Sequence, residues 1–420
     1  MSIRKQPYNA WVKFLPYFAL VLIFLAVFPV DAAPKRIGGI DLVWFWSDAD
    51  GEEGAHRGEE PINPASVVKL ATTLWAFEQL GPDYRYLTEI AIDGEIDEEN
   101  GVLRGDLYVR GGGDPDFHVE NAQRMAATLH ALGIRSVDGT LYVNDAFWIG
   151  WERGSEGTET NRTKRALLMA KRLQSAWNTR RWSRGTLAEM RRFREKHPGT
   201  RFLDLPVREI GGLGDNDTAL SVATHRSNPL LTMLKRFNDY SNNDIERLGY
   251  RLGSPDQMRQ FFVERWGQAA QGMSFATLSG LGSSRMTPRQ MARLVKELDE
   301  VVTASGNDLS DLLPALDCGR NTLRNYPGLQ FPTGSFVGKT GTLVQTDGGV
   351  VALAGTVRTE LGPIYFALAA PRNGARLTAA RRAQVRWLNA EMGDRVVAAA
   401  ECRPYGMRSY DSIQVERSAR

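Results

Sequence analysis

The sequence predicts an α+β protein whose main sheet is assembled from both ends of the chain and carries helices. Short apolar segments rich in small and β-branched residues occur near the start, at 39–58, and return at 336–371. Between about 218 and 300 the apolar spacing is mostly helical. A chain of 420 residues is too long for one core, so we expect two or three units.

The N-terminus has the layout of an export signal. Arg4, Lys5 and Lys13 precede or flank an apolar run, and small residues follow at Val30 and Ala32. This layout predicts a signal peptide that is cleaved after Ala32, with an uncleaved membrane anchor as the alternative. In both cases the rest of the chain is expected in the periplasm.

The first folded segments are expected to be strands and a buried helix. Residues 39–46 and 52–58 are typical of two strands around a turn, and 66–81 has helical spacing that ends at Gly81 before Pro82. Ser66 therefore lies at the start of the helix, with Lys69 one turn further on.

The middle of the chain changes from strands to a basic segment. Residues 86–117 and 133–145 show alternating apolar positions broken by Gly and Asp turns. The segment 161–201 then holds about a dozen Arg and Lys residues against two acids, and is expected to form a helical hairpin or an extended arm. Either it is a solvated helical insert, or it is a surface for an anionic polymer or a membrane.

The last third of the folded chain returns to strands. Helices are expected at 228–241 and 287–302, strands at 336–343, 348–359 and 362–371, and a closing helix at 376–392. A sheet built from both ends of the chain, with helices on it, follows from this order.

Composition excludes some classes of function. The formal net charge is +3, which gives no support to nucleic-acid binding. The two cysteines, Cys318 and Cys402, form no C-x-x-C pattern, and five scattered histidines make a metal site unexpected; we expect no cofactor. An oxidising compartment permits a disulfide between the cysteines, but the sequence leaves their pairing open.

Three short motifs carry candidate chemistry. In "SVVK" a lysine three positions after Ser66 lies on the same helix face, and Lys69 can take the serine proton if burial or a nearby cation lowers its pKa. Taken alone, this pattern is better explained by an N-cap serine and a surface lysine. In "SNN", Ser241 and Asn243 can point into one cleft, where the hydroxyl can relay a proton and the amide can bind a peptide.

The third motif is "GKTGT" at the start of an expected strand. Lys339, Thr340 and Thr342 suit an anionic peptide end, and Gly341 lets a substrate approach the backbone. The backbone N–H groups of Thr342 and Ser66 can form an oxyanion hole.

The three motifs in this order resemble those of the penicillin-recognising serine enzymes. The blocks "GDLYVRGGGDPDF" and "LSGLGSSRMTPRQM" make the chain similar to low-molecular-mass class C penicillin-binding proteins, the D-alanyl-D-alanine carboxypeptidase and endopeptidase family. The resemblance covers about 37–147 and 218–392. It implies an antiparallel sheet with flanking helices, a helical subdomain, and an inserted β-rich and basic subdomain.

The resemblance divides the chain into five parts. Residues 1–32 are the signal or anchor, and 37–95 are the first part of a transpeptidase-like domain. An inserted β-rich and basic region follows at 96–217. The second part of the transpeptidase-like domain is 218–392, and 393–420 form a basic tail.

The resemblance also implies a role for each matched residue. Ser66 would attack a D-alanyl peptide carbonyl and form an acyl-enzyme, with Lys69 as its base. Ser241 would pass a proton to the leaving amine, and Asn243 would hold the substrate amide. Lys339 would supply positive potential that lowers the pKa of Lys69. Thr340 and Thr342, with Gly341 between them, would bind the terminal carboxylate of a peptidoglycan stem peptide, and β-lactams would be inhibitors.

Two departures from the family pattern concern the surroundings of the site. Asp239 stands where the family commonly has a lysine. "NDAFW" matches only part of a family turn in which the position of Asp145 would contact the stem-peptide side chain. The alternatives to an active peptidase are an inactive cell-wall-binding scaffold of the same fold and a β-lactamase, for which no E-x-x-x-N loop is found.

Overall fold

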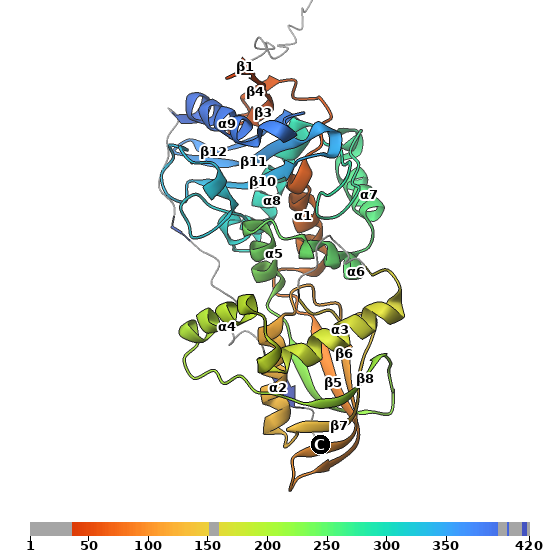
Figure 1. Ribbon diagram of the computed structural model, residues 1–420. Helices are drawn as coiled ribbons and strands as arrows, with labels where there is room; N and C mark the ends of the chain where they lie inside the picture. The colour runs from red at the N-terminus through yellow and green to blue at the C-terminus, as the bar shows by residue number, and fades with distance from the viewer. Residues whose placement is uncertain (1–35, 151–158, 394–400, 403–413, 418–420) are drawn as a thin grey trace, which may run out of the picture. The chain divides into compact units, whose positions relative to one another are not determined.

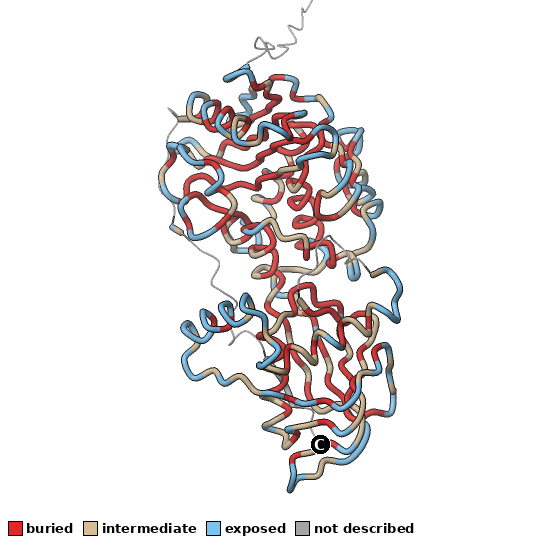
Figure 2. Tube along the Cα trace, viewed as in Figure 1, coloured by how far each residue is buried: buried red, intermediate tan, exposed pale blue. Residues whose placement is uncertain are grey.

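The computed structural model describes residues 36–150, 159–393, 401–402 and 414–417. The expected signal or anchor at 1–32 lies outside these residues. Figure 1 shows two large sheets, each with its own helices, and Figure 2 shows that the buried residues gather along the strands and the helices packed on them.

The first large sheet joins strands from both ends of the chain, as predicted. Its strands are β3 (Val43–Ser47), β4 (Glu53–His56), β10 (Phe336–Leu343), β11 (Val350–Thr359) and β12 (Gly362–Pro371). The order is β10-β11-β12-β3-β4 and all pairs are antiparallel. Because β3 pairs with β12, the sheet is complete only when the first strands of the fold meet the last ones. Two short strands, β1 (Arg36–Ile37) and β2 (Ile40–Asp41), form a separate ribbon.

Helices cover both faces of this sheet (Figure 1). The helix α9 (Leu377–Met392) packs on one face with Trp44 and Leu353, and α1 (Val68–Leu80) and α8 (Pro288–Ala304) pack on the other with Phe45 and Ala354. Side chains alternate between the faces of a strand, so the continuous apolar runs of β11 and β12 serve both cores. Of the remaining helices of this region, α5 (Leu230–Asp239) and α7 (Pro255–Trp266) pack against α1, and α6 (Gly249–Leu252) packs against the 3₁₀ segment Asn243–Leu248.

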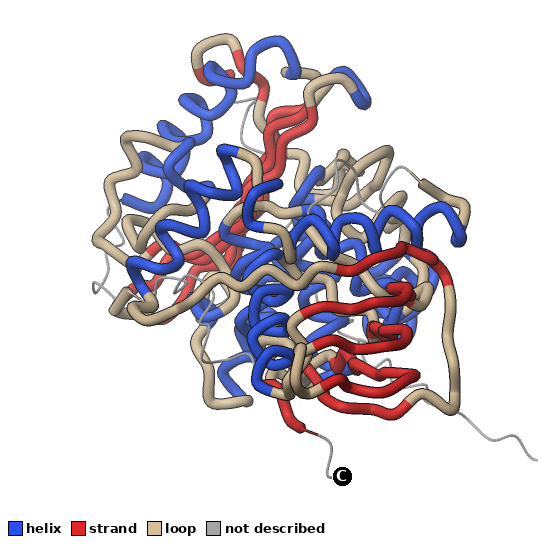
Figure 3. Tube along the Cα trace, turned by 60° about the horizontal axis from the view of Figure 1, so that its bottom comes forward, coloured by secondary structure: helices blue, strands red, loops and turns tan. Residues whose placement is uncertain are grey.

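The second large sheet has six strands. They are β5 (Leu87–Asp97), β6 (Val102–Gly111), β7 (Ser136–Val143), β8 (Val207–Leu213), β9 (Leu220–Arg226) and β13 (Gln414–Arg417). The order is β13-β9-β5-β6-β7-β8, and only β6–β7 and β7–β8 are parallel. The helices α2 (Val119–Ala131) and α3 (Arg162–Ala176) make the connections between the parallel strands, and Figure 3 shows the strands together with the helices beside them.

The second sheet differs from the expected insert in its extent. It begins at Leu87 and includes β9, which ends at Arg226, so it reaches beyond 96–217 in both directions. The stretch after 218 therefore starts as a strand where helical structure was expected. The tail also contributes β13, which pairs with β9.

The basic segment 161–201 is not a uniform arm. It contains α3, a short 3₁₀ turn at Thr179–Arg181 and α4 (Arg184–Lys196). In α3 the side chains of Met169, Ala170 and Leu173 are fully buried in the core of the second sheet, so this half of the segment is structural.

Cys318 and Cys402 form a disulfide with a Cα–Cα distance of 5.2 Å. The bond settles the pairing that the sequence left open, and it attaches the chain beyond α9 to the loop before β10.

Candidate active site

Ser66 lies in a tight turn directly before α1. The turn is a 3₁₀ helix, Ala65–Val67, and Ala65 has a φ of 50°, which is rare for a residue with a side chain. Asn63 stabilises it, because its Oδ1 accepts the N–H of Ala65 over 3.0 Å and its Nδ2 donates to the carbonyl of Gly282 over 2.9 Å. The surrounding structure thus fixes a strained backbone beside the half-buried Ser66, as is common at functional sites.

Lys69 is completely buried and reaches three acceptors. Its Nζ lies 3.2 Å from Ser66 Oγ, 2.9 Å from Asn243 Oδ1 and 2.7 Å from the Ser279 carbonyl oxygen. A protonated lysine donates one hydrogen to each. A neutral amine has only two hydrogens, which can stay on Asn243 and Ser279, and the lone pair then faces the Ser66 hydroxyl.

Burial makes that neutral form accessible at ordinary pH. The loss of hydration lowers the pKa of Lys69 to about 7, and the nearby charge of Glu246 opposes this change. The positive potential of Lys339 was expected to lower the pKa of Lys69, but it is not the main cause. The repulsion between the two lysines acts on Lys339 instead. Burial first, and Lys69 second, lower the pKa of Lys339 well below its usual value.

Ser241 and Lys339 form the second half of the site. Lys339 Nζ donates to Ser241 Oγ over 3.0 Å and to the carbonyl of Thr340 over 2.8 Å. Ser241 follows α5 and has a φ of 52°, so both motif serines are set by unusual backbone conformations. With its oxygen accepting from Lys339, the Ser241 hydroxyl keeps its own proton free for donation.

The "KTGT" residues lie on β10, at the edge of the first sheet. Gly338 donates its N–H to Pro314 on the open side of β10, and the two-residue period of a strand turns the N–H groups of Thr340 and Thr342 to the same side. These groups can pair with an extended peptide. A Cβ atom on Gly341 would lie 2.6 Å from the Pro64 carbonyl oxygen, so glycine is required for β10 to approach the turn that carries Ser66.

Asp239, the departure from the family pattern, is part of a buried ion pair. Its Oδ1 lies 2.9 Å from Lys235 Nζ, one turn earlier on α5, and both side chains are nearly inaccessible. Burial raises the pKa of Asp239, while Lys235 and Lys339 oppose the rise. The acid therefore adds negative charge next to Lys339.

Sequence reasoning missed the residues that support the lysine. Glu246 accepts the N–H groups of Leu278 and Ser279 over 3.0 and 2.7 Å, and so fixes the carbonyl to which Lys69 donates. Gly280 has a φ of 85°, and a Cβ there would lie 2.0 Å from the Ala65 carbonyl oxygen. The "SGLG" run in "LSGLGSSRM" and the "NPAS" turn were visible signals for Gly280 and Asn63, whereas nothing local marks Glu246.

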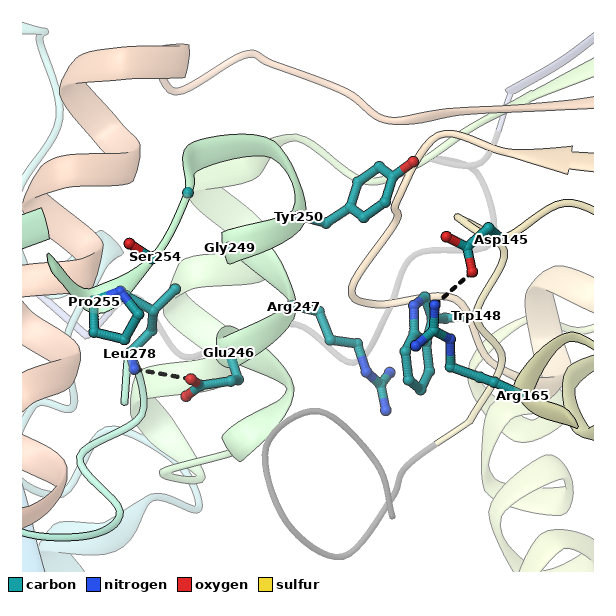
Figure 4. A pocket seen from close by; sticks show the side chains of 11 residues that line it. Asp145, Trp148, Arg165, Glu246, Arg247, Gly249, Tyr250, Ser254, Pro255 and Leu278 are labelled. Carbon is teal, nitrogen blue, oxygen red and sulfur yellow. Dashed lines mark hydrogen bonds and ion pairs between the residues drawn. The ribbon is translucent and has the colours of Figure 1, made fainter. Parts of the chain in front are cut away.

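A cavity of about 440 Å³ is lined by Glu246, Leu278 and Trp148, among others (Figure 4). Arg165 and Arg247 flank the ring of Trp148 at 5.5 and 4.5 Å from its centroid. Asp145 also lines the cavity, but its carboxylate accepts hydrogen bonds from Arg162 over 2.9 Å and from Arg165 over 2.5 Å. Its charge is thus compensated by the protein itself.

In the part of the chain that the structure describes, no group of three or more His, Cys, Asp or Glu side chains is arranged to hold a metal ion. Over the same residues, no helix combines the length and the apolar character that crossing a membrane requires.

The fold and the meeting of the three motifs define the class of penicillin-recognising serine enzymes. More specifically, the chain belongs to the D-Ala-D-Ala carboxypeptidase 3 (S13) family, whose model matches residues 49–165 and 209–391. Both steps confirm the family and the fold that the motifs predicted.

Two curated relatives match over shorter segments. A D-alanyl-D-alanine carboxypeptidase of an Actinomadura species is 39% identical over 121 residues, which is 29% of this chain and 22% of that protein. The D-alanyl-D-alanine carboxypeptidase DacB of Haemophilus influenzae is 29% identical over 99 residues, 24% of this chain and 20% of that protein. The chain thus spans about a fifth of the length of these curated relatives.

Solved structures share the fold over most of the chain. The predatory peptidoglycan endopeptidase Bd3459 of Bdellovibrio bacteriovorus has a TM-score of 0.72 at 22% identity, covering 90% of this chain and 98% of that one. Penicillin-binding protein 4 of Haemophilus influenzae has a TM-score of 0.59 at 17% identity, covering 85% and 97%.

Proposed function

We propose that this chain is a serine-type D-Ala-D-Ala carboxypeptidase, DD-endopeptidase, or both, acting on peptidoglycan stem peptides in the periplasm. The observation that carries the proposal is the contact of Lys69, buried and with a pKa of about 7, with Ser66 Oγ over 3.2 Å. A base near its own pKa at neutral pH is suited to accept and return a proton in each cycle.

In the proposed mechanism neutral Lys69 takes the proton of Ser66, and the serine oxygen bonds to the carbonyl carbon between two D-alanines. The backbone N–H groups of Ser66 and Thr342 stabilise the negative oxygen of the intermediate. The proton held by Lys69 then passes through the hydroxyl of Ser241 to the leaving amine; the C–N bond breaks, the amine departs, and Lys69 is neutral again. Water then attacks the ester with Lys69 as base, which releases the shortened peptide and restores the serine.

The same groups hold the substrate. Asn243 binds a backbone amide, and Thr340 and Thr342 on the open edge of β10 bind the terminal carboxylate, with Gly341 leaving room for the chain. Penicillins would acylate Ser66 in the same way, and the Bd3459 endopeptidase, which shares the fold, has been captured acylated by penicillin G.

Labelling with a fluorescent penicillin tests the proposal. The chain without its first 32 residues should be labelled stably, and Ser66→Ala should abolish labelling while its thermal melting stays unchanged. An unlabelled wild type would favour the scaffold alternative, and a label that decays within seconds would favour a β-lactamase. Release of D-alanine from a pentapeptide, compared with cleavage of a cross-linked dimer, then separates the two peptidase activities.

We also propose that α4 contacts an anionic polymer of the cell wall. Met190 and Phe193 of this helix are buried, whereas Arg191, Arg192 and Arg194 are exposed, so the helix is anchored by two apolar side chains and presents charge to solvent beside the exposed Leu187. Pull-down on cell-wall sacculi should weaken with salt and in the triple Arg→Ala variant. The control variant replaces the exposed Arg259, Arg382 and Arg386 by Ala, which changes the charge by the same amount. Equal losses of sacculus binding in the two variants would contradict the proposal, and so would preferential binding to anionic vesicles.

A further inference from the structure

A cation outside the three motifs touches the far end of the "KTGT" strand. Arg381, in the second turn of α9, donates from Nη2 to the Oγ1 of Thr342 over 3.2 Å. Thr342 lies on the face of β10 that carries Phe336, which is the face that packs against α9. The contact therefore joins the C-terminal helix to the residue proposed to bind the substrate carboxylate.

The surroundings of Arg381 leave its charge uncompensated. The residue is half-buried, and among the described residues no carboxylate forms an ion pair with it. Its Nε is fully buried and finds no acceptor within the same part of the chain. The hydroxyl of Tyr326 also interacts with the guanidinium, but this neutral group does not balance the charge. Such an arrangement costs folding free energy unless an anion completes it, so it points to a negative group that arrives with a ligand.

The hydroxyl of Thr342 can transmit this charge. Because its oxygen accepts a hydrogen bond from the guanidinium, its own O–H is free to donate outward, and donation to a carboxylate oxygen is strengthened by the cation behind it. An arginine stays protonated at all relevant pH values. Lys339, by contrast, is a buried lysine whose pKa is lowered, so it is a less constant source of positive charge.

We propose that Arg381 is a positioning and specificity residue for the terminal carboxylate of the substrate, acting through the hydroxyl of Thr342. The proposal rests on the proposed function and deepens it, because it assigns recognition of the anionic end to a residue outside the three motifs.

The experiment compares a ligand that carries the carboxylate with one that lacks it. The second-order rate constants of acylation by benzylpenicillin and by its methyl ester are measured for the wild type and for Arg381→Met. In Arg381→Met the acylation rate constant for benzylpenicillin should fall about 10-fold or more, because hydrogen bonds that involve charged groups are the stronger ones. The rate constant for the methyl ester should fall less than about 2-fold. The ratio of the two constants is the readout, because a merely structural defect lowers both equally.

Two further variants complete the design. Arg382→Met removes an exposed arginine from the adjacent position of the same helix and should leave the ratio unchanged. Arg381→Lys keeps the charge and should restore most of the ratio. If Arg381→Met does not fold, as judged by its melting, Arg381→Gln provides the neutral variant for the same comparison.

The outcomes separate this inference from the proposed function. If neither benzylpenicillin nor its methyl ester acylates the wild type, both the proposed function and this inference are wrong. A wild type that is acylated, together with an Arg381→Met or Arg381→Gln variant whose ratio matches that of Arg382→Met, would overturn the inference alone.

Discussion

Lys69 donates to Oδ1 of Asn243 over 2.9 Å, although 174 positions separate the two residues in the chain. The bond joins the first motif to the second and leaves the lysine no freedom to swing away from Ser66. The hydrogen bonds to Asn243 and to the Ser279 carbonyl use the two hydrogens of the neutral amine. The lone pair of Lys69 Nζ is therefore directed at the hydroxyl of Ser66.

The pKa of Lys69 predicts the pH dependence of acylation. Below pH 7 the lysine is protonated and cannot accept the serine proton; above pH 7 it is neutral. The second-order rate constant for a fluorescent penicillin should rise about tenfold per unit at low pH and level off above about pH 7. Stopped-flow labelling from pH 5 to 9 measures this, and a flat profile would argue against Lys69 as the base.

The same shift predicts a change in stability with pH. The unfolded chain has a lysine pKa of about 10.4, so between pH 7 and 10 the unfolded state binds more protons than the folded state, and folding becomes more favourable as pH rises. In Lys69→Met this contribution is absent. The unfolding free energy of the wild type, relative to that of the variant, should therefore increase from pH 7 to 10 in urea titrations; a decrease would contradict the lowered pKa.

Gly280→Ala should disable the site without unfolding the protein. The new Cβ would lie 2.0 Å from the Ala65 carbonyl oxygen and displace the Ser66 turn. Gly272→Ala is a matched control, because Gly272 has a similar φ of 77° but no atom within 4 Å of the added Cβ. Both variants should lose about 1 kcal/mol of stability through backbone strain, and Gly280→Ala about 1–3 kcal/mol more because its Cβ forces the neighbouring backbone to shift. Only Gly280→Ala should lose acylation, by about 100-fold for a displacement of about 1 Å.

Asp239→Asn should be strongly destabilising. It leaves Lys235 as an unpaired buried cation, which costs about 3–5 kcal/mol in comparable sites. Replacing both residues, as Lys235→Met with Asp239→Leu, should recover most of that loss. Guanidinium unfolding at pH 7 tests the difference. If the single variant is as stable as the wild type, the pair is not the buried ion pair described above.

Loss of the Cys318–Cys402 disulfide should lower stability. The bond closes a loop across a sequence separation of 84 residues, and removing native disulfides typically costs about 2–5 kcal/mol. Unfolding of the wild type should shift to lower denaturant concentration with reducing agent, to the transition of Cys402→Ser, which should not respond to reductant. Two free thiols in the unreduced wild type would refute the bond.

Local patterns were sufficient for the sheet that carries the site. The apolar segments at 336–343 and 362–371 become β10 and β12 with the predicted bounds, because each is short, small-residue-rich and ended by glycine turns. The three motifs also meet as predicted. Their spacing within each element determines which face the side chains share, and the sheet brings β10 to the Ser66 turn.

The parts that were not predicted depend on contacts between distant segments. Glu246 acts through two backbone N–H groups near residue 278, and Arg381 reaches Thr342 from another helix. Neither relationship has a local periodic signal. The strand β13 was missed because a strand of four residues in a polar tail is defined mainly by the partner, β9, with which it pairs.

The pairing of β3 with β12 has a consequence for when the protein becomes reactive. Residues 43–47 can pair only after residues 365–369 have been made. The strand contacts that complete the sheet therefore join distant parts of the chain and form late in folding. Lys69 acquires its lowered pKa only by burial in that fold. During synthesis Ser66 is therefore an ordinary serine, and its reactivity begins when nearly the whole chain has been made and packed.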